Sequence, residues 1–214
     1  MNGASVSEPV SATVPGEISP VVDAMAGYPG PWALCGGWAV DAWLGRVTRD
    51  HGDIDVSVFL PDQRLVFEHL RGWQMVAHEP HVPDGKNAVW DGWPLEVPGH
   101  LHCRIDRGEP APESGAMWPN DGYVLDLQLD DRDGADWLLS REPRITLPAE
   151  RAIAVSPWGV PAVVPEVLLF FKARDLRRRD RVDFEALRPL LTSEQRAWLR
   201  DAINAVGHPW LSSL

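Results

Sequence analysis

The sequence predicts an α+β fold (α/β-like), in which helices flank a small mixed β-sheet and a C-terminal helical subdomain follows. Asp53–Phe59 alternates apolar and polar residues with the period of two that a half-buried strand requires. Residues 73–129 are β-like, with short apolar runs separated by connections rich in Pro and Gly. Helical patterns dominate beyond residue 136. We therefore divide the chain into a disordered segment at 1–16, a core at 17–135 and a mainly helical subdomain at 136–214.

Local signals place the N-terminal elements in order. A short apolar strand at Trp32–Cys35 is broken by Gly36-Gly37, and the helix that follows, Trp38–Leu44, ends at Gly45. The strand at 53–59 comes next, and then a helix that Pro61 opens. Four later strands are expected, near 74–77, 88–90, 101–105 and 124–129. The Asp-rich residues 130–135 are expected to form an acidic turn.

Helices are expected in the C-terminal part of the chain. Pro165–Leu176 has a helical pattern with Pro in its first turn, and Asp180–Leu191 continues as a helix. Thr192 and Gln195 match a capping box, in which each residue satisfies a backbone N–H at the start of a helix. This last helix is expected to run through Val206.

Composition restricts the kinds of partner. The 214 residues suit one globular unit or a compact two-part domain, and a formal net charge of -11 argues against tight, sequence-independent binding to nucleic acid. The same charge is compatible with a cationic small molecule. Two cysteines, Cys35 and Cys103, are too few for a zinc site and match no disulfide framework, so a reducing compartment is expected. With neither a membrane span nor a signal peptide apparent, the expected location is cytoplasmic.

Two neighbouring motifs point to specific chemistry. Gly36-Gly37 precedes a helix, where Gly allows backbone N–H groups to approach a phosphate. Asp53 and Asp55 lie on one face of the same strand, roughly 7 Å apart between their Cα atoms. Two such anions need a compensating cation, and Mg²⁺ prefers oxygen ligands. Either motif alone is common in ordinary turns and on solvated strands, so their combination carries the prediction.

This combination resembles the signature of the DNA polymerase β-like nucleotidyltransferase superfamily. The string GGWAVDAWLGRVTRDHGDIDV is similar to the aminoglycoside and lincosamide nucleotidyltransferases of antibiotic resistance. The run PEVLLFFKAR is similar to a helix from which a Lys reaches the nucleotide phosphates in related bacterial enzymes. The resemblance is strongest over residues 32–60 and looser over 120–214.

The resemblance implies an enzyme that transfers NMP, with AMP expected, from an NTP to a hydroxyl group of a small molecule, with two Mg²⁺ ions as cofactors. Asp53 and Asp55 would be catalytic residues and metal ligands. The family places a third carboxylate on a later strand between apolar residues, and Asp126 fits that pattern best. Asp126 could also act as general base, or it could lie on the exposed face of an edge strand. Asp106 is the alternative third carboxylate.

The resemblance also implies a set of nucleotide-binding residues: Gly36, Gly37, Arg49, His51 and Lys172. Arg49 and His51 come just before the paired carboxylates, near the expected phosphates, although His51 could instead bond to its own loop. Lys172 lies on an otherwise apolar helix face, and it either extends to solvent or reaches into the cleft.

Several other polar residues have two interpretations. Asp41 is expected to be a structural partner of the loop that follows its helix, through Arg46 or Arg49. A basic cluster follows Lys172, and it is either a solvated face paired with nearby Asp residues or a contact for nucleotide or RNA. The cluster consists of Arg174, Arg177, Arg178, Arg179 and Arg181. His102 and Arg104 alternate on one strand and could line an acceptor pocket.

Three functions remain open on the sequence. The first is modification of a small-molecule acceptor such as an aminoglycoside or a lincosamide. The second is a toxin-like nucleotidyltransferase that acts on tRNA or protein, which the basic cluster would serve. The third is a non-catalytic nucleotide-binding module, whose usual sign is the loss of a carboxylate. All three carboxylate positions can be filled here by Asp53, Asp55 and Asp126. The preferred NTP and the oligomeric state are left unassigned.

Overall fold

The computed structural model describes residues 13–78, 81–82, 87–105, 125–174 and 177–214. It confirms an α+β fold built on a mixed sheet. Its strands are β1 Ala33–Leu34, β2 Asp55–Phe59, β3 Trp73–Ala77, β4 Ala88–Val89, β5 Gly99–Ile105, β6 Leu125–Asp133, β7 Asp136–Leu138, β8 Thr146–Pro148, β9 Ile153–Val155 and β10 Pro161–Val163.

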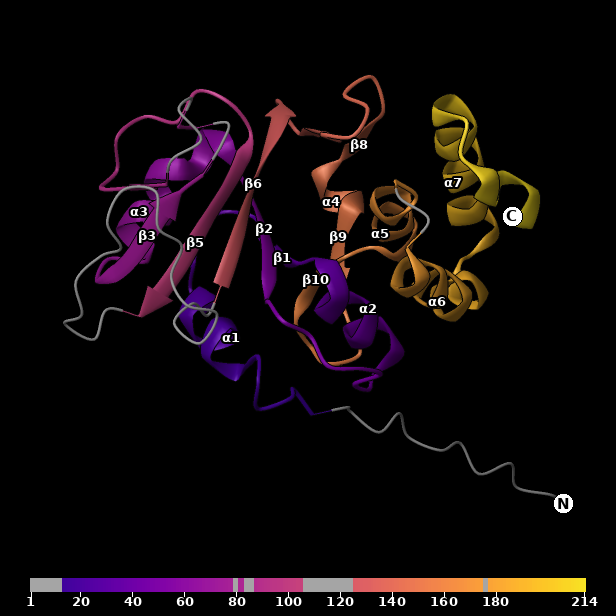
Figure 1. The fold of residues 1–214 in the computed structure, drawn as a ribbon, viewed down its shortest axis with the longest axis horizontal. Coiled ribbons are helices and arrows are strands. Elements are labelled where there is room, and N and C mark those ends of the chain that lie inside the picture. The colour runs from indigo at the N-terminus through magenta and orange to yellow at the C-terminus, as the bar shows by residue number, and fades with distance from the viewer. Residues whose placement is uncertain (1–12, 79–80, 83–86, 106–124, 175–176) are drawn as a thin grey trace, which may run out of the picture.

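Helices flank this sheet (Figure 1). The α-helices are α1 Ser19–Met25, α2 Gly36–Leu44, α3 Gln63–His69, α4 Ala149–Ala152, α5 Pro165–Lys172, α6 Arg178–Leu187 and α7 Ser193–Val206. Short 3-10 turns lie at Leu60–Asp62, Arg188–Leu190 and Pro209–Ser213. None of the helices in the described ranges has the length and apolar character of a membrane span.

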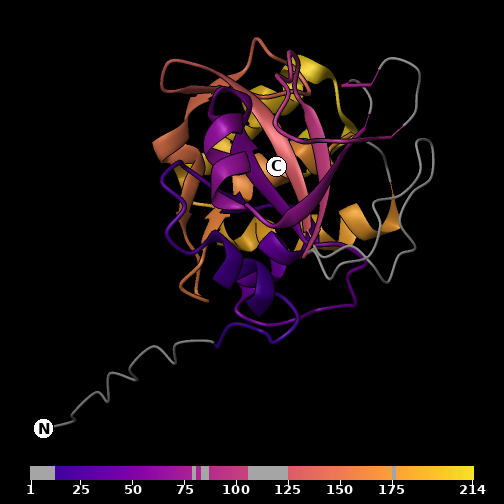
Figure 2. The same ribbon diagram turned by 90° about the vertical axis from the view of Figure 1, so that its left-hand side faces the viewer.

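The sheet has the strand order β4-β3-β5-β6-β2-β1-β10-β9, and β7 and β8 extend it from the end of β6. The β2–β6 and β1–β10 pairs are parallel, and the other pairs are antiparallel. Figure 1 shows α5, α6 and α7 together at one side of the sheet, with α2 beside them. Figure 2, seen from the side of α3 and β3, places these C-terminal helices behind the strands.

The two faces of the central strands differ in chemistry, because paired residues on neighbouring strands point to the same side. One face is apolar and buried: Val56, Val58, Met75, Leu101, Leu127 and Leu129. The other face is polar over three adjacent strands: Asp55 and Ser57 on β2, Asp126 and Gln128 on β6, and His102 and His100 on β5. The apolar side forms the core, so the polar side is available for a site.

Several local predictions are confirmed. Gly45 ends α2 in the left-handed conformation with φ 68°. The Thr192 side chain accepts from the backbone N–H of Gln195, and the Gln195 side chain accepts from the backbone N–H of Thr192, so the capping box is complete. The last α-helix ends at Val206, as expected.

The expected acidic turn at 130–135 is wrong. Strand β6 continues through Asp133 and turns back only at Gly134, whose φ is 58°. Asp130 is buried on the strand, where its carboxylate accepts a hydrogen bond from the Ser57 hydroxyl. Pairing of β6 with β7 satisfies the backbone of this stretch, so tertiary contacts outweigh the local turn preference of Asp.

Residues 136–163 continue the sheet as well as connecting it to the helices. Strand β10 pairs with β1, β9 pairs with β10, and the Trp43 indole N–H donates to the carbonyl of Val163 at 2.7 Å. The sheet therefore spans the position, near residue 136, at which the sequence changes character.

Candidate functional site

The pairing of β2 with β6 brings two carboxylates together. Asp55 lies directly opposite Asp126 in this parallel register, so their side chains project from one face on strands that are about 4.8 Å apart. The backbone N–H of Asp126 donates to the carbonyl of Ile54 at 2.9 Å, which extends the pairing to the residue before β2. The predicted third carboxylate, Asp126, is thus on a central strand and beside Asp55. The runner-up, Asp106, lies outside the described residues.

Asp53 precedes the strand rather than starting it, because β2 begins at Asp55. Asp53 is exposed, whereas Asp55 is half-buried. Burial, and then the charge of Asp53, raises the pKa of Asp55 to about 6, while the charge of Lys172 opposes this rise. The two carboxylates therefore interact electrostatically, as their spacing predicts.

Asp126 carries an unsatisfied acceptor. Its Oδ1 atom is buried and has no hydrogen-bond partner among the described residues. Burial raises the pKa of Asp126 to about 8, and the charges of Asp55 and Asp53 raise it further. A buried, unpaired carboxylate beside two others is unfavourable unless a cation joins them. Carboxylate oxygens are the ligands that Mg²⁺ prefers.

The Gly-Gly turn leaves room for these groups. Gly36 adopts φ 61°, and a Cβ atom there would collide with the Asp55 carboxylate. A Cβ on Gly37 would collide with the His51 ring and would lie 2.7 Å from an Arg49 guanidinium nitrogen. The backbone N–H of Cys35 donates to the carbonyl of Asp55 at 2.9 Å, which fixes the start of α2 against β2. Glycine is required at both positions by close approach.

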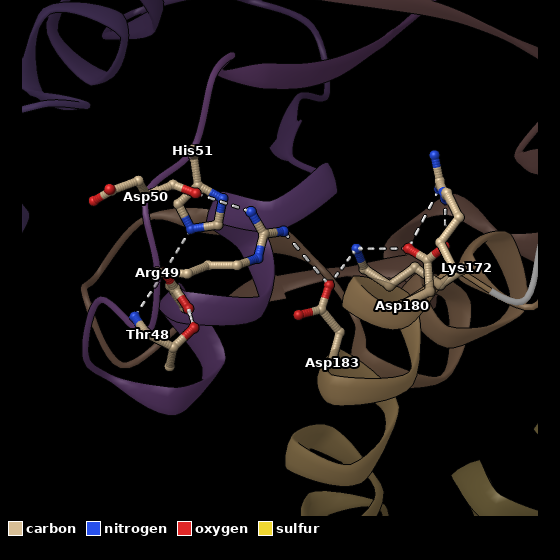
Figure 3. A network of polar contacts seen from close by, with 9 residues as sticks. Thr48, Arg49, Asp50, His51, Lys172, Asp180 and Asp183 are labelled. Carbon is tan, nitrogen blue, oxygen red and sulfur yellow. Dashed lines mark hydrogen bonds and ion pairs between the residues drawn. The ribbon is translucent and has the colours of Figure 1, made fainter.

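Asp41 organises the loop between α2 and β2 (Figure 3 labels Thr48 and His51). The fully buried carboxylate accepts from the Thr48 backbone N–H and the Thr48 hydroxyl, and it lies 2.6 Å from His51 Nε2. The expected partners, Arg46 and Arg49, are not the side chains that bind it. The His51 ring also packs on Trp38 at 4.5 Å between centroids. The structure therefore places His51 within its own loop.

Arg49 and Lys172 converge on one carboxylate from opposite sides (Figure 3). Lys172 Nζ lies 2.7 Å from Asp183 Oδ2, and an Arg49 guanidinium nitrogen lies 3.7 Å from the same oxygen. Lys172 is also 4.0 Å from Asp180, which Arg177 binds at 2.6 Å. This network joins the loop after α2 to helices α5 and α6. Lys172 points inward, in agreement with the cleft interpretation.

A cavity of about 350 Å³ lies between the polar sheet face and α5. Its lining includes Gly36, Asp55, Gln128, Asp130, Lys172 and Arg177. Gln128 donates to Asp55 at 3.4 Å, so it contacts the carboxylate pair directly. The site thus combines carboxylates, a Gly-Gly turn and an inward lysine around one hollow.

The arginines of the basic cluster after Lys172 have different surroundings in the structure. Arg177 binds Asp180 and lines the cavity, and the charge of Arg179 lowers the pKa of Asp55. The others are exposed on α6 or just before it: Arg174, Arg178 and Arg181.

His102 lies beside the carboxylates, opposite Asp126 in the β5–β6 register, with Nε2 at 3.7 Å from Asp126 Oδ2. Arg104 is buried further along the same strand and donates to Gln74 at 2.9 Å. Burial, and then the neighbouring His78 and His100, lower the pKa of His102 to about 4. Of the two residues suggested for an acceptor pocket, His102 is therefore the one beside the site.

Sequence reasoning missed the role of Asp183 and the contact of Gln128 with Asp55. Asp183 follows Lys172 by eleven positions on a different helix, so no local pattern pairs them. Gln128 could have been found, because it lies two residues after Asp126 on the same strand face. The strand expected at 124–129 contains both.

The architecture is that of a nucleotidyltransferase fold, shared with solved antibiotic adenylyltransferases. The lincomycin-bound crystal structure of the lincosamide antibiotic adenylyltransferase LnuA superposes with a TM-score of 0.53 at 18% identity, covering 84% of this chain and 99% of LnuA. The solution structure of the antibiotic-resistance factor ANT(2'')-Ia gives a TM-score of 0.53 at 17% identity, covering 88% of this chain and 90% of that structure's chain. A crystal structure of ANT(2'')-Ia in complex with adenylyl-2''-tobramycin gives a TM-score of 0.51 at 16% identity, covering 86% of this chain and 93% of that structure's chain.

The family model for aminoglycoside-2''-adenylyltransferase matches residues 17–73 of this chain. That segment contains Gly36-Gly37, the Asp41 loop, Asp53 and Asp55. A comparison with curated proteins finds no match. The matches confirm the resemblance to aminoglycoside and lincosamide nucleotidyltransferases, and the class of protein that they indicate is a nucleotidyltransferase enzyme.

Proposed function

We propose that this chain is a Mg²⁺-dependent nucleotidyltransferase that transfers NMP, with AMP expected, from an NTP to a hydroxyl group of a small molecule. The observation that carries this proposal is the register of Asp55 with Asp126 on parallel strands, with Asp53 just before the first of them. Asp55 lines the cavity together with Gly36 and Lys172, and Asp126 lies directly beside Asp55 on the neighbouring strand.

Asp53, Asp55 and Asp126 would hold the metal. The buried, unpartnered Oδ1 of Asp126 and the electrostatic coupling of the three groups are the features that fit a divalent cation. When bound, Mg²⁺ neutralises phosphate charge and stabilises the attacking and leaving oxygens. Most of the remaining catalysis in such a transfer is positioning.

Asp126 is the proposed general base. Its carboxylate lies beside Asp55 on the polar sheet face, and its raised pKa suits a group that accepts the proton of the acceptor hydroxyl. Asp53 is too exposed for this role, and the pKa of Asp55, about 6, is raised less than that of Asp126, about 8. The geometry therefore favours Asp126 for the proton transfer.

The phosphates would lie between Gly36-Gly37 and the cationic side chains of Lys172 and Arg49. The N-terminus of α2, a helix of nine residues, presents backbone N–H groups there, and a Cβ atom at either glycine would fill the space. Lys172 and Arg49 are held in place by Asp183, so they need little reordering to meet a phosphate. His51 supports this arrangement indirectly, through Asp41.

The proposed acceptor is an antibiotic of the aminoglycoside or lincosamide class. The relatives of known structure include one bound to lincomycin and one with adenylyl-2''-tobramycin. The net charge of -11 also favours a polyamine such as an aminoglycoside over a polyanion. Between the two classes the charge therefore favours the aminoglycoside.

A screen of NTPs against aminoglycosides and lincosamides tests the proposal, with pyrophosphate release as the readout. Asp55→Asn is the catalytic variant, and the same substitution at exposed Asp201 on α7 is its matched control. We expect Asp55→Asn to lose at least about 100-fold in kcat, because it removes several kcal/mol of charge stabilisation. Asp201→Asn should leave kcat unchanged.

Two outcomes would replace this function by another. Label from an NTP that appears on RNA or protein, and is lost in Asp55→Asn, would indicate a macromolecular acceptor. Calorimetric binding of Mg-NTP without pyrophosphate release from any acceptor would indicate a non-catalytic module.

A further inference from the structure

Three histidines lie together on the polar sheet face, next to the carboxylates but separate from them. His78 follows β3, and His100 and His102 lie on β5. One ring nitrogen from each histidine can be chosen so that all three lie within 4.8 Å of one another. The ring centroids are 3.9 Å apart for His78 and His102, 5.1 Å for His78 and His100, and 5.2 Å for His100 and His102.

The backbone explains why the three rings meet. His100 and His102 are two residues apart on one strand, so they share a face. Strand β3 runs antiparallel to β5 with Ala77 opposite Leu101, and His78 is the next residue along the chain. His78 therefore arrives at the level of His100. Two of the three side chains are anchored on a strand inside the sheet, which holds them more rigidly than a loop would.

The histidine nitrogens are not all used by the protein. His78 Nε2 is buried and lacks a hydrogen-bond partner among the residues that the structure describes. Both ring nitrogens of the nearby His81 have the same property, and a Cβ on Gly99 would lie 2.5 Å from His81 Nε2. Buried polar atoms without partners are costly, and the unpartnered His78 Nε2 within the group is what a bound ligand would satisfy.

We propose that His78, His100 and His102 form a second metal site, for a divalent transition metal of the Zn²⁺ type. Three imidazoles are a nitrogen donor set, which suits zinc and its neighbours and not Mg²⁺. Zn–N bonds of about 2.05 Å in tetrahedral geometry need nitrogens about 3.4 Å apart, so the rings must approach by roughly an ångström. Side-chain rotation supplies that movement. A three-histidine set leaves a fourth position open to water or to a donor on a small molecule.

Asp126 links this site to the carboxylates. Its Oδ2 atom lies 3.7 Å from His102 Nε2, and the two residues are directly opposite in the β5–β6 register. Metal-bound histidines commonly direct the ring nitrogen that is not bound to the metal at a carboxylate, which orients the ring. Asp126 would fill that position for His102 through Oδ2, while Oδ1 faces the carboxylate site. The open coordination position would then lie on the same sheet face as the proposed acceptor.

Metal titration of the full chain tests the proposal, with protein that carries no histidine tag and has been stripped with a chelator. We expect one equivalent of Zn²⁺ to bind in the presence of excess Mg²⁺, measured by competition with a chromogenic chelator. Co²⁺ should bind in the same place and give the visible d–d absorption of a nitrogen-ligated, low-coordinate ion. His100→Ala should lose this equivalent, and Asp55→Asn should retain it.

His69→Ala is the matched control, because His69 lies on α3 outside the cluster and its Nε2 is bonded to the Ala24 carbonyl. It should retain the full equivalent of Zn²⁺. The proposal is overturned if Co²⁺ gives no d–d absorption with the unmodified chain, a readout that does not depend on any variant folding. It is equally overturned if Mg²⁺ displaces the bound Zn²⁺, since the carboxylates would then be its ligands. None of these readouts requires nucleotidyl transfer, so they are independent of the proposed enzymatic function.

Discussion

At the scale of single residues, two glycines and a few buried carboxylates determine the geometry of the site. Gly36 is constrained in two ways, by its positive φ of 61° and by the close approach of the Asp55 carboxylate. Asp130 is constrained by burial next to Ser57. A single substitution at Gly36 or at Asp130 tests each of these constraints by itself.

Gly36→Ala should reduce both stability and activity. An alanine at this φ costs roughly 1–2 kcal/mol of backbone strain, and its Cβ would also displace Asp55. Gly159→Ala imposes similar strain at φ 76° with nothing within 4 Å of the Cβ, so it isolates the backbone cost. Chemical denaturation should show a loss of stability in both variants, and only Gly36→Ala should lose at least about 10-fold in kcat. Equal kcat in the two variants would contradict the close approach.

Asp130 should make stability depend on pH. Burial raises the pKa of Asp130 to about 7 in the folded protein, so folding favours its protonated form. The contribution of protonated Asp130 to the stability of the fold is fully present below its unfolded pKa of about 4, and it is lost as pH rises through about 7. The Asn side chain of Asp130→Asn cannot titrate. Between pH 5 and pH 8 the free energy of unfolding of this variant should therefore rise, relative to that of the unmodified chain, by on the order of a few kcal/mol.

Urea denaturation at the two pH values measures this gain. Asp133→Asn is the control, because Asp133 is exposed on the same strand and should leave the pH dependence unchanged. Parallel pH profiles for Asp130→Asn and the unmodified chain would show that Asp130 is not the titrating group.

At the scale of elements, the loop after α2 and the helix α6 are joined through shared ion pairs. Asp183 on α6 contacts Lys172 of α5 and Arg49 of the loop (Figure 3), and Lys172 also lines the cavity. Asp183 is 2% exposed, so its charge is well protected from screening by solvent. This network of ion pairs fixes the side chains of Lys172 and Arg49 relative to Gly36-Gly37.

Asp183→Asn should loosen this junction. Lys172 would keep only the longer contact with Asp180, so we expect a loss of about 1–3 kcal/mol in the free energy of unfolding. If the two cations position phosphates, the KM for NTP should also rise. Glu185→Gln is the matched control, because Glu185 is an exposed carboxylate on the same helix that pairs with Arg188. It should change neither quantity by a comparable amount.

Elements with a local signal could be predicted from the sequence. The alternation after Asp53 gives the strand β2, and the Thr192–Gln195 box gives the start of α7. Contacts made by long-range pairing could not be predicted. His78 meets His102 only because β3 pairs with β5, and Asp130 is buried only because β6 continues into a hairpin with β7. No local pattern distinguishes those residues from ordinary loop and turn residues.

At the scale of the whole molecule, the proposed nucleotide position lies between the polar sheet face and the C-terminal helices. Lys172 from α5 and Asp55 from β2 face the same cavity, so a ligand there contacts both parts of the chain. Such a ligand binds the folded protein and not the unfolded chain, and it should stabilise the whole molecule. Thermal stability is therefore a direct measure of occupancy.

ATP with Mg²⁺ should raise the melting temperature. At 100 times the Kd the stabilisation is about 2.7 kcal/mol, which corresponds to roughly 5–10 °C for a chain of this size. Asp55→Asn should lose most of this shift, because the metal that bridges protein and phosphate would be held poorly. Thermal-shift measurements with ATP alone, Mg²⁺ alone and both together check the result. A full shift from ATP without any divalent cation would argue against carboxylate-held metal.

The pairing of Asp55 with Asp126 also has a consequence for how the protein is made. The two residues are neighbours in space, yet β3, β4 and β5 lie between them in the chain. A ribosome delivers the Gly-Gly turn and Asp55 early and Asp126 much later, and parallel pairing across so long a connection is slow because its loop must first close. A nascent chain therefore holds Asp53 and Asp55 without their third partner while the 71 residues from Asp55 to Asp126 are added, and the three carboxylates come together only when β6 inserts between β2 and β5.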